Sequence, residues 1–253
     1  MTGYVALGSS MAAGPGIRPS AVGAPFRAGR SARNYPHLVA DRLGVDLTDV
    51  TYSGATTANV LDEPQHGTPP QIEALDGTET LVTVTIGGND VGYVPMLMAA
   101  GLPRILRRLP PIGELFDRTT RDRALVEVGE SLRRVGETVR ARAPRARVLF
   151  VDYLTLLPPA GEPVSPLSGA DAALGRRIAD TLERLTGEAA ADTGCEWVRA
   201  ARASREHHAW SAQPWTTRPG LPWPARPAPL HPNAAGMRAV ADLVVEHVGT
   251  RSD

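Results

Sequence analysis

Four short stretches of the 253-residue sequence carry the residue types that acyl transfer needs: Gly8-Ser9-Ser10, Ser53-Gly54-Ala55, Gly87-Gly88-Asn89-Asp90 and Leu230-His231-Pro232-Asn233. A serine that attacks an ester must lose its proton to a nearby base. Histidine is the side chain whose pKa suits that task at neutral pH. The stretches therefore predict nucleophilic catalysis by one of the two adjacent serines, with His231 as the base.

Three of these stretches also contain donors for the negative charge that develops on a tetrahedral intermediate. Gly54 has no Cβ atom, so its backbone N–H can approach a ligand closely. Asn89 adds a side-chain amide, and the backbone N–H of Ser10 is a third donor. We expect these three groups to form an oxyanion hole, and we interpret the neighbouring Asp90 as a structural hydrogen-bond acceptor.

Predicted strands precede the first three stretches and position them. Tyr4–Leu7 is a short apolar run, residues 47–52 alternate in polarity, and residues 80–86 are β-branched and almost uncharged. Open α/β sheets bind ligands at the carboxyl ends of their strands, so the three stretches should meet at one edge. Two further strands are predicted at residues 147–153 and 195–198.

Helical patterns separate these strands. A proline near the first turn marks a helix at residues 34–44, and apolar spacing predicts others at residues 121–142, 174–185 and 233–248. Strands that alternate with helices predict a parallel sheet with helices on both faces. We expect a single domain over residues 1–253.

Two segments do not fit this alternation. Residues 91–120 crowd Met, Leu, Arg and Pro, which is consistent with a helix pair that covers the sheet or with an apolar flap beside the site. Residues 199–230 are irregular and rich in Trp and Pro. Long irregular loops in compact domains usually serve function, although packing of the loop is the expected role of the Trp residues.

Composition excludes several other classes of protein. The formal net charge is zero, which argues against a nucleic-acid partner, and all cations other than His are Arg. Cys195 is the only cysteine, so an intrachain disulfide is impossible. The sequence shows no signal peptide and no run of roughly 20 apolar residues. We therefore expect a cytoplasmic protein without a stable membrane anchor.

The four stretches, in this order, resemble those of the SGNH hydrolases, also called GDSL-type esterases and lipases. The resemblance runs from Tyr4 to the last helix and is most specific at residues 87–90 and 231–236. It implies a flavodoxin-like three-layer α/β/α sandwich, with Ser10 as nucleophile and His231 as general base and acid. It also implies an oxyanion hole of Ser10, Gly54 and Asn89, a small-molecule ester substrate, and no metal or organic cofactor.

The sequence departs from the family pattern at two positions. Ser9 stands where the family usually has Asp, and Ala228 stands three residues before His231, where the family also usually has Asp. A complete triad is therefore not legible. Either a backbone carbonyl orients His231 in a Ser–His dyad, or a carboxylate from elsewhere, such as Glu206, does so.

These observations predict a serine esterase that hydrolyses carboxylic esters through an acyl-enzyme. Two alternatives stay open at this point. One is a carbohydrate O-deacetylase, and the other is an inactive SGNH-fold binding module, which the absent Asp keeps in consideration. The pair His207-His208 gives little support to a metal site, because no Cys or carboxylate spacing accompanies it.

Overall fold

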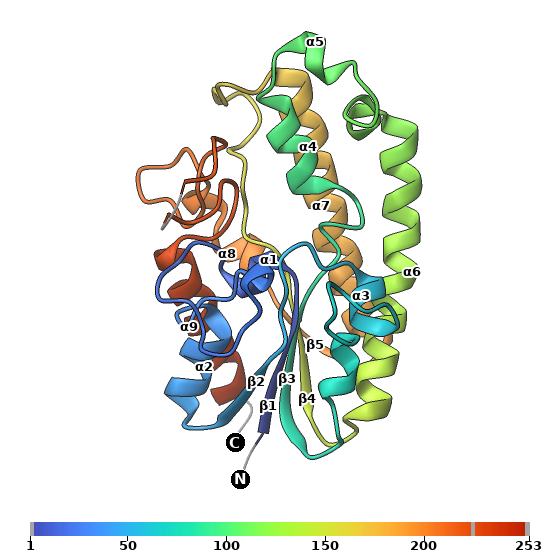
Figure 1. Ribbon diagram of the computed structural model, residues 1–253, viewed down its shortest axis with the longest axis vertical. Coiled ribbons are helices and arrows are strands. Elements are labelled where there is room, and N and C mark those ends of the chain that lie inside the picture. Colours follow the sequence, from blue (N-terminus) through green and yellow to red (C-terminus); the bar gives the residue numbers. More distant parts are fainter. Residues whose placement is uncertain (1–2, 224–225, 251–253) are drawn as a thin grey trace.

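A five-stranded parallel sheet in the order β2-β1-β3-β4-β5 forms the centre of the molecule (Figure 1). The computed structural model describes residues 3–223 and 226–250. The strands are β1 (Gly3–Gly8), β2 (Asp46–Asp49), β3 (Glu79–Thr85), β4 (Arg147–Val151) and β5 (Glu196–Val198). All five predicted strands are present. β2 is shorter than expected, although the N–H groups of Val50 and Tyr52 still donate to the carbonyls of Ala6 and Gly8 beyond its end, and the chain turns only at Ser53-Gly54.

Helices cover both faces of this sheet. Alternation along β1 directs Val5 and Leu7 to one face and Tyr4 and Ala6 to the other, each into its own apolar core. The first core is completed by α3 (Thr57–Leu61), α4 (Tyr93–Ala100), α6 (Arg118–Arg142) and α7 (Gly169–Asp192), and the second by α2 (Tyr35–Leu43) and α9 (Ala234–Gly249). The predicted three-layer α/β/α sandwich is confirmed.

The remaining helical elements are short and lie in the connections. They are α1 (Ser10–Ala13), α5 (Arg104–Arg107), α8 (Ala200–Ala203) and the 3-10 helices η1 (Phe26–Ala28), η2 (Gln71–Ala74), η3 (Gly113–Phe116) and η4 (Arg205–His207). Within the described residues, no helix is long and apolar enough to cross a membrane.

The two longest helices extend past the carboxyl edge of the sheet (Figure 1). α6 has 25 residues and α7 has 24, so each is about 37 Å long, whereas the longest strand covers about 24 Å. α6 begins three residues before the predicted start because the Asp117 side chain caps it by accepting the N–H of Thr120. The overhanging turns form a helical wall above the edge.

The segment at residues 91–120 divides into two parts. In α4, Met96 and Leu97 are fully buried in the core, and a Cβ atom at Gly175 of α7 would lie 2.8 Å from Leu97. This half is a covering helix. Around α5, at the top of Figure 1, apolar side chains such as Ile105 are exposed. That the segment acts as a flap over substrate stays a prediction.

The irregular segment at residues 199–230 is fastened to the site by its tryptophans. Trp215 stacks on His207 with ring centroids 4.1 Å apart, and its carbonyl accepts the N–H of Asn233. The Trp210 indole donates to the carbonyl of Ser165. These contacts agree with the interpretation that Trp210 and Trp215 pack the loop, whereas Trp223 is 67% exposed and does not follow it. Residues 224–225 lie outside the described part of this segment.

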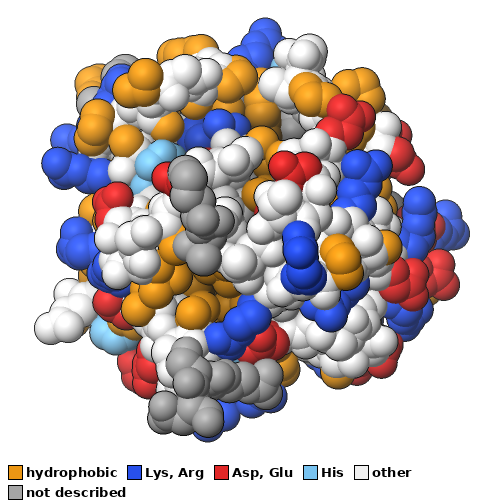
Figure 2. Space-filling model, turned by 90° about the horizontal axis from the view of Figure 1, so that it is seen from below, with side chains coloured by type: hydrophobic (Ala, Val, Ile, Leu, Met, Phe, Trp, Pro, Cys, Tyr) orange, Lys and Arg blue, Asp and Glu red, His pale blue; other side chains and the backbone are white. Residues whose placement is uncertain are grey.

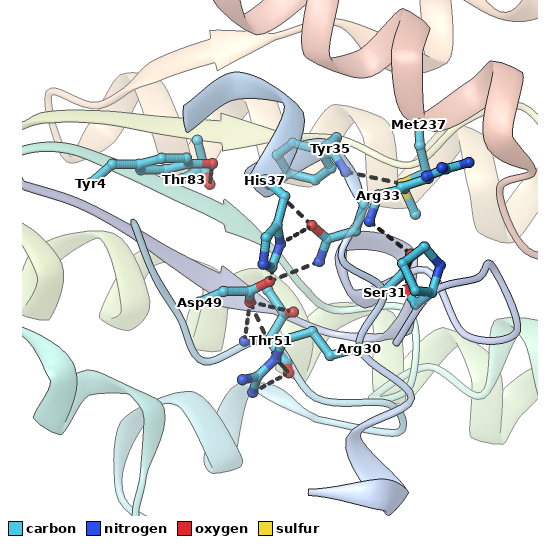
Figure 3. Close-up of polar contacts among 12 residues, drawn as sticks. Tyr4, Arg30, Ser31, Arg33, Tyr35, His37, Asp49, Thr51, Thr83 and Met237 are labelled. Carbon is cyan, nitrogen blue, oxygen red and sulfur yellow. Dashed lines mark hydrogen bonds and ion pairs between the residues drawn. The ribbon is translucent and has the colours of Figure 1, made fainter. Parts of the chain in front are cut away.

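A buried ionic cluster fixes the end of β2 (Figure 3). The Asp49 carboxylate accepts hydrogen bonds from Asn34 and Thr51 and lies 3.5 Å from Arg30 and 3.4 Å from His37. Burial raises the pKa of Asp49. Hydrogen bonds from His37, Asn34 and Thr51, together with the Arg30 charge, lower the pKa by more than burial raises it, so the net shift is downward. The cluster ties the loop at residues 14–33 and the start of α2 to the sheet.

Candidate active site

The turn after β1 places Ser10 at the carboxyl edge of the sheet. Gly8 has φ +151°, and a Cβ atom there would lie 2.6 Å from the carbonyl oxygen of Thr85, so only glycine allows this approach to β3. The N–H of Ser9 then donates to Thr85 at 2.9 Å. Ser9 becomes the N-cap of α1, and Ser10 its first residue.

Ser10 faces His231 across the site. The His231 Nε2 atom lies 2.8 Å from Ser10 Oγ, although the two residues are 221 positions apart. His231 belongs to the loop before α9, a helix whose N-terminus Asn233 caps by accepting the N–H groups of Ala235 and Gly236. Ser10 is 7% exposed and His231 is partly exposed. The pair has the geometry of a hydroxyl nucleophile and its base.

A backbone carbonyl holds the other nitrogen of the ring. His231 Nδ1–H donates to the carbonyl oxygen of Pro229 at 2.8 Å. Between them, Leu230 is fully buried with φ +59°, a left-handed conformation that is strained for a residue with a branched side chain. This turn directs the Pro229 carbonyl back onto the ring, which fixes the tautomer with an unprotonated Nε2 facing Ser10.

The surroundings favour the neutral form of His231. Burial lowers the pKa of the ring below its ordinary value, and the hydrogen bond to the Pro229 carbonyl offsets only part of that shift. Within the described chain, no carboxylate forms a hydrogen bond or ion pair with the ring. The neutral ring is therefore suited to accept a proton, but its protonated form would lack an anionic partner among the described residues.

The expected oxyanion donors converge on the same edge. Gly54 has φ +80° in the loop after β2, and the Asn89 side-chain amide donates one N–H to the carbonyl of Ala55 at 2.8 Å. This bond holds Asn89 beside the Gly54 turn and leaves its second N–H available. Among the described residues, the backbone N–H groups of Ser10 and Gly54 have no intramolecular acceptor.

Asp90 fastens the Asn89 turn from below. Its carboxylate accepts the backbone N–H of Thr57 at 3.0 Å and also the Thr57 hydroxyl. Burial raises the pKa of Asp90, and the hydrogen bonds from Thr57 counteract part of that increase. These contacts fit the structural acceptor expected from the sequence.

Comparison with known proteins follows this geometry. Residues 6–239 match the GDSL-like Lipase/Acylhydrolase family. The chain belongs to this family. Lipase 2 of Streptomyces coelicolor is 34% identical over 97% of this chain and 85% of its own, and a lipase of Streptomyces rimosus is 28% identical over 93% and 82%. The predicted enzyme class, a carboxylic ester hydrolase of the SGNH/GDSL type, is confirmed.

Solved structures of the family agree with the fold. Phospholipase A1 from Streptomyces albidoflavus NA297 superimposes with a TM-score of 0.78 at 28% identity, covering 98% of both chains. The extracellular lipase of Streptomyces rimosus gives a TM-score of 0.79 at 27% identity, covering 98% of this chain and 99% of that one.

Compared with the GDSL pattern, the serine in the Asp position is a structural group here. Ser9 is fully buried, and its Oγ lies 2.8 Å from the Tyr153 hydroxyl. The same hydroxyl accepts the N–H of Gly88 at 3.1 Å, and a Cβ atom at Gly88 would lie 2.2 Å from the tyrosine ring. Tyr153 thus joins the serine turn to the Asn89 turn. Sequence reasoning missed it, although it ends the predicted strand at residues 147–153.

Ala228 stands at the other position where this chain diverges from the GDSL family pattern, and it forms its contacts through its backbone. Its N–H donates to Pro15 at 2.9 Å, and its carbonyl accepts the Thr217 hydroxyl at 2.6 Å. Glu206, the alternative orienting carboxylate, is exposed and lines a separate cavity with Asp152 and Tyr153, not the His231 ring. The alternative in which the Glu206 carboxylate orients the His231 ring therefore has no contact to support it.

His207, the last residue of η4, and His208, which follows it, form structural contacts. His207 Nδ1 lies 2.8 Å from the carbonyl oxygen of Gln213, and the backbone N–H of Trp210 donates to His208 Nδ1. No group of three or more His, Cys, Asp or Glu side chains in the described ranges is arranged to hold a metal ion.

Proposed function

We propose that this protein is a serine esterase that hydrolyses carboxylic esters with a Ser10–His231 dyad. The observation that carries the proposal is the chain of two hydrogen bonds from Ser10 Oγ through His231 to the Pro229 carbonyl. A carboxylate in a triad fixes the tautomer of its histidine and stabilises the imidazolium. The Pro229 carbonyl fixes the tautomer fully, but it stabilises the imidazolium only through its dipole.

The reaction follows from these positions. Ser10 Oγ attacks the ester carbonyl carbon while its proton passes to His231 Nε2. The N–H groups of Ser10 and Gly54 and the Asn89 amide stabilise the oxyanion. The intermediate then collapses, the alcohol leaves with the proton from Nε2, and an acyl group remains on Ser10. Water, deprotonated by His231, attacks this acyl group, releases the acid and restores the serine.

Labelling with a fluorophosphonate tests this assignment. We expect the probe to modify Ser10, and we expect Ser10→Ala to lose both labelling and the hydrolysis of p-nitrophenyl esters. Ser9→Ala is the matched control, because it removes the neighbouring hydroxyl and leaves the dyad. Labelling that survives in Ser10→Ala and disappears in Ser9→Ala would reverse the assignment.

The two alternative functions have different standing. The inactive binding module is disfavoured by the 2.8 Å contact between Ser10 and His231, which a module without chemistry does not need. No contact described here favours carbohydrate O-deacetylation over the hydrolysis of other esters. Activity on acetylated xylan that exceeds activity on p-nitrophenyl esters would favour the deacetylase.

A further inference from the structure

Exposed apolar side chains gather on two loops beside the site. Val22 and Phe26, in the loop at residues 14–33, are essentially fully exposed. Leu221 and Trp223 follow at 91% and 67% exposure in the Trp/Pro-rich segment. Burial of such side chains in a folded protein is favourable, so a cluster left in water indicates a surface that another phase or molecule covers.

A groove brings the two loops together. It has a volume of about 430 Å³, and its walls include Phe26 and Pro25 from one loop and Trp223 and Pro222 from the other. Arg18 and Arg226 also line it. We call this region the loop surface, which consists of Val22, Phe26, Leu221, Trp223, Arg18, Arg27 and Arg226.

The charge of the loop surface has one sign. Residues 11–40 and 207–241 contain no Asp or Glu. Arg18, Arg27 and Arg226 are exposed, and within the described residues none of them forms an ion pair. Glu73 lines the adjacent groove together with Pro25 and Arg30, so the cationic region ends there.

The opposite end of the molecule differs. Seen from below, basic and acidic side chains lie intermixed on that face (Figure 2). At the top of Figure 1, α5 also exposes apolar side chains; there Arg107 pairs with Asp171 at 2.6 Å, whereas Arg108 is exposed and forms no ion pair among the described residues, but no aromatic side chain is among the exposed ones. The loop surface therefore combines exposed aromatic residues with cations that have no acidic partner.

The loop surface is continuous with the candidate active site. Ala228 lines the groove and donates its N–H to Pro15, and Pro229, the next residue, accepts the His231 ring N–H. Pro15 directly follows Gly14, the residue that ends the Ser10 helix. An object that rests on the loop surface therefore lies beside the Ser10–His231 pair.

We propose that the loop surface docks onto an anionic lipid–water interface. Aromatic side chains with a polar edge, such as Trp, prefer the interface, and apolar side chains enter it. Arginines beside them are attracted to anionic headgroups, an attraction that salt screens. The docking itself does not depend on the proposed esterase function. Its consequence, that ester substrate enters from the interface, rests on that function.

Sedimentation with lipid vesicles tests the docking. Ser10→Ala protein is used, so that vesicles stay intact whatever the activity. We expect it to bind vesicles of phosphatidylcholine with phosphatidylglycerol, to bind vesicles of phosphatidylcholine alone much more weakly, and to be released by high salt. Adding Phe26→Ser and Trp223→Ser should weaken binding by about tenfold or more, because two apolar anchors are removed.

Matched variants separate this surface from general stickiness. Val126 is also 67% exposed but lies on α6, next to Glu127, so Val126→Ser should leave vesicle binding unchanged. In the active protein, Phe26→Ser with Trp223→Ser should leave hydrolysis of soluble p-nitrophenyl acetate unchanged. Arg18→Gln with Arg226→Gln should reduce binding to anionic vesicles.

Three results would overturn the proposal. They are equal binding to neutral and anionic vesicles, equal loss of binding in the Val126 control, and a dimer in solution that the Phe26 and Trp223 changes dissociate. Vesicle binding by a protein that hydrolyses no ester would refute the proposed function but leave the docking in place.

Discussion

The two halves of the carboxyl edge of the sheet are built differently. At the ends of β1, β2 and β3, polar groups are bound tightly. Gln71 clamps Gly8 with hydrogen bonds of 2.6 and 3.0 Å, and Asp49 sits in its ionic cluster. At the ends of β4 and β5 lies a cavity of about 400 Å³, and Asp152 accepts hydrogen bonds only from neutral groups, the Trp197 indole and the N–H of Ala201.

The two buried aspartates show what this difference does. Both lie at the ends of strands; the Asp49 side chain is 4% exposed, and Asp152 as a whole residue is also 4% exposed. The pKa of Asp49 is lowered, because charged and polar partners outweigh burial. Burial raises the pKa of Asp152 to about 7, and its two neutral donors only moderate the increase. We expect the chemistry to occur in the half whose groups are fixed, where preorganised donors have most effect.

The largest expected effect comes from removing a fixed donor in the first half. Asn89→Ala should lower kcat by about 10²–10³, with little change in KM, because the donor acts on the transition state. Steady-state kinetics on p-nitrophenyl esters measure this. Asn59→Ala, which alters the nearby α3 cap, is the control and should keep kcat within about tenfold. A change confined to KM would mean that Asn89 only binds substrate.

Asparagine substitutions should distinguish the two aspartates by the stability of the protein. Asp49→Asn should lower the free energy of unfolding by about 2 kcal/mol at neutral pH, because hydrogen bonds to a charged group are lost. The pKa of Asp49 is depressed in the folded state, so its contribution is present above the unfolded pKa and is lost as pH falls through the folded one.

The sign is reversed for Asp152. Its pKa is raised when folded, so its contribution is full below the unfolded value of 3.8 and is lost as pH rises towards about 7. Asp152→Asn should therefore become more favourable relative to the wild-type protein across that interval. Urea unfolding at several pH values measures both variants. The same pH dependence in both would remove the distinction between the two halves.

A smaller effect is expected where the halves are joined. Tyr153→Phe removes the hydroxyl that contacts Ser9 and Gly88 and should lower kcat by about tenfold, with KM nearly unchanged, because the serine and Asn89 turns lose a shared anchor. Tyr4→Phe deletes a similar buried hydrogen bond, to Thr83 at 2.8 Å, away from the site. If both variants lose the same stability and neither loses kcat, Tyr153 has no positioning role.

The smallest effects concern the base. Because the pKa of His231 is lowered, the acidic limb of kcat/KM should have its midpoint below the ordinary imidazole value of 6.5. Ala228→Asp should move that midpoint upward, provided that the new carboxylate reaches the ring, because an adjacent anion favours the protonated form.

Glu206→Gln should change kcat by less than roughly tenfold. A far larger loss, with folding intact by circular dichroism, would refute the dyad.

Much of the fold was predictable because burial leaves a pattern in the sequence. β3 is β-branched and almost uncharged, and the apolar spacing of α6 follows one helical face. The family resemblance also anticipated that Ser10 and His231 would meet, as they do at 2.8 Å. Their catalytic roles, the oxyanion hole and the cytoplasmic location stay predictions.

Other features leave no such pattern. Every residue has a backbone carbonyl, so the residue types at positions 227–231 do not show that the carbonyl of Pro229 is the hydrogen-bond acceptor of His231. The left-handed Leu230 likewise contradicts the preference of its side chain, and only the surrounding contacts maintain it. Tyr153 and the Asp49 cluster depend on residues distant in sequence, which local periodicity does not relate.

The contact between Gly88 and Tyr153 has a consequence for how the chain can evolve. No side chain fits at position 88 while the tyrosine ring is present, since the ring already occupies the space of a Cβ atom. A relative with a residue larger than glycine at position 88 should therefore carry a smaller side chain at position 153. It must then hold the residue at position 9 in another way. An exchange at position 88 should therefore be accompanied by one at position 153, and an exchange at position 88 alone marks a lineage in which the site has been rebuilt.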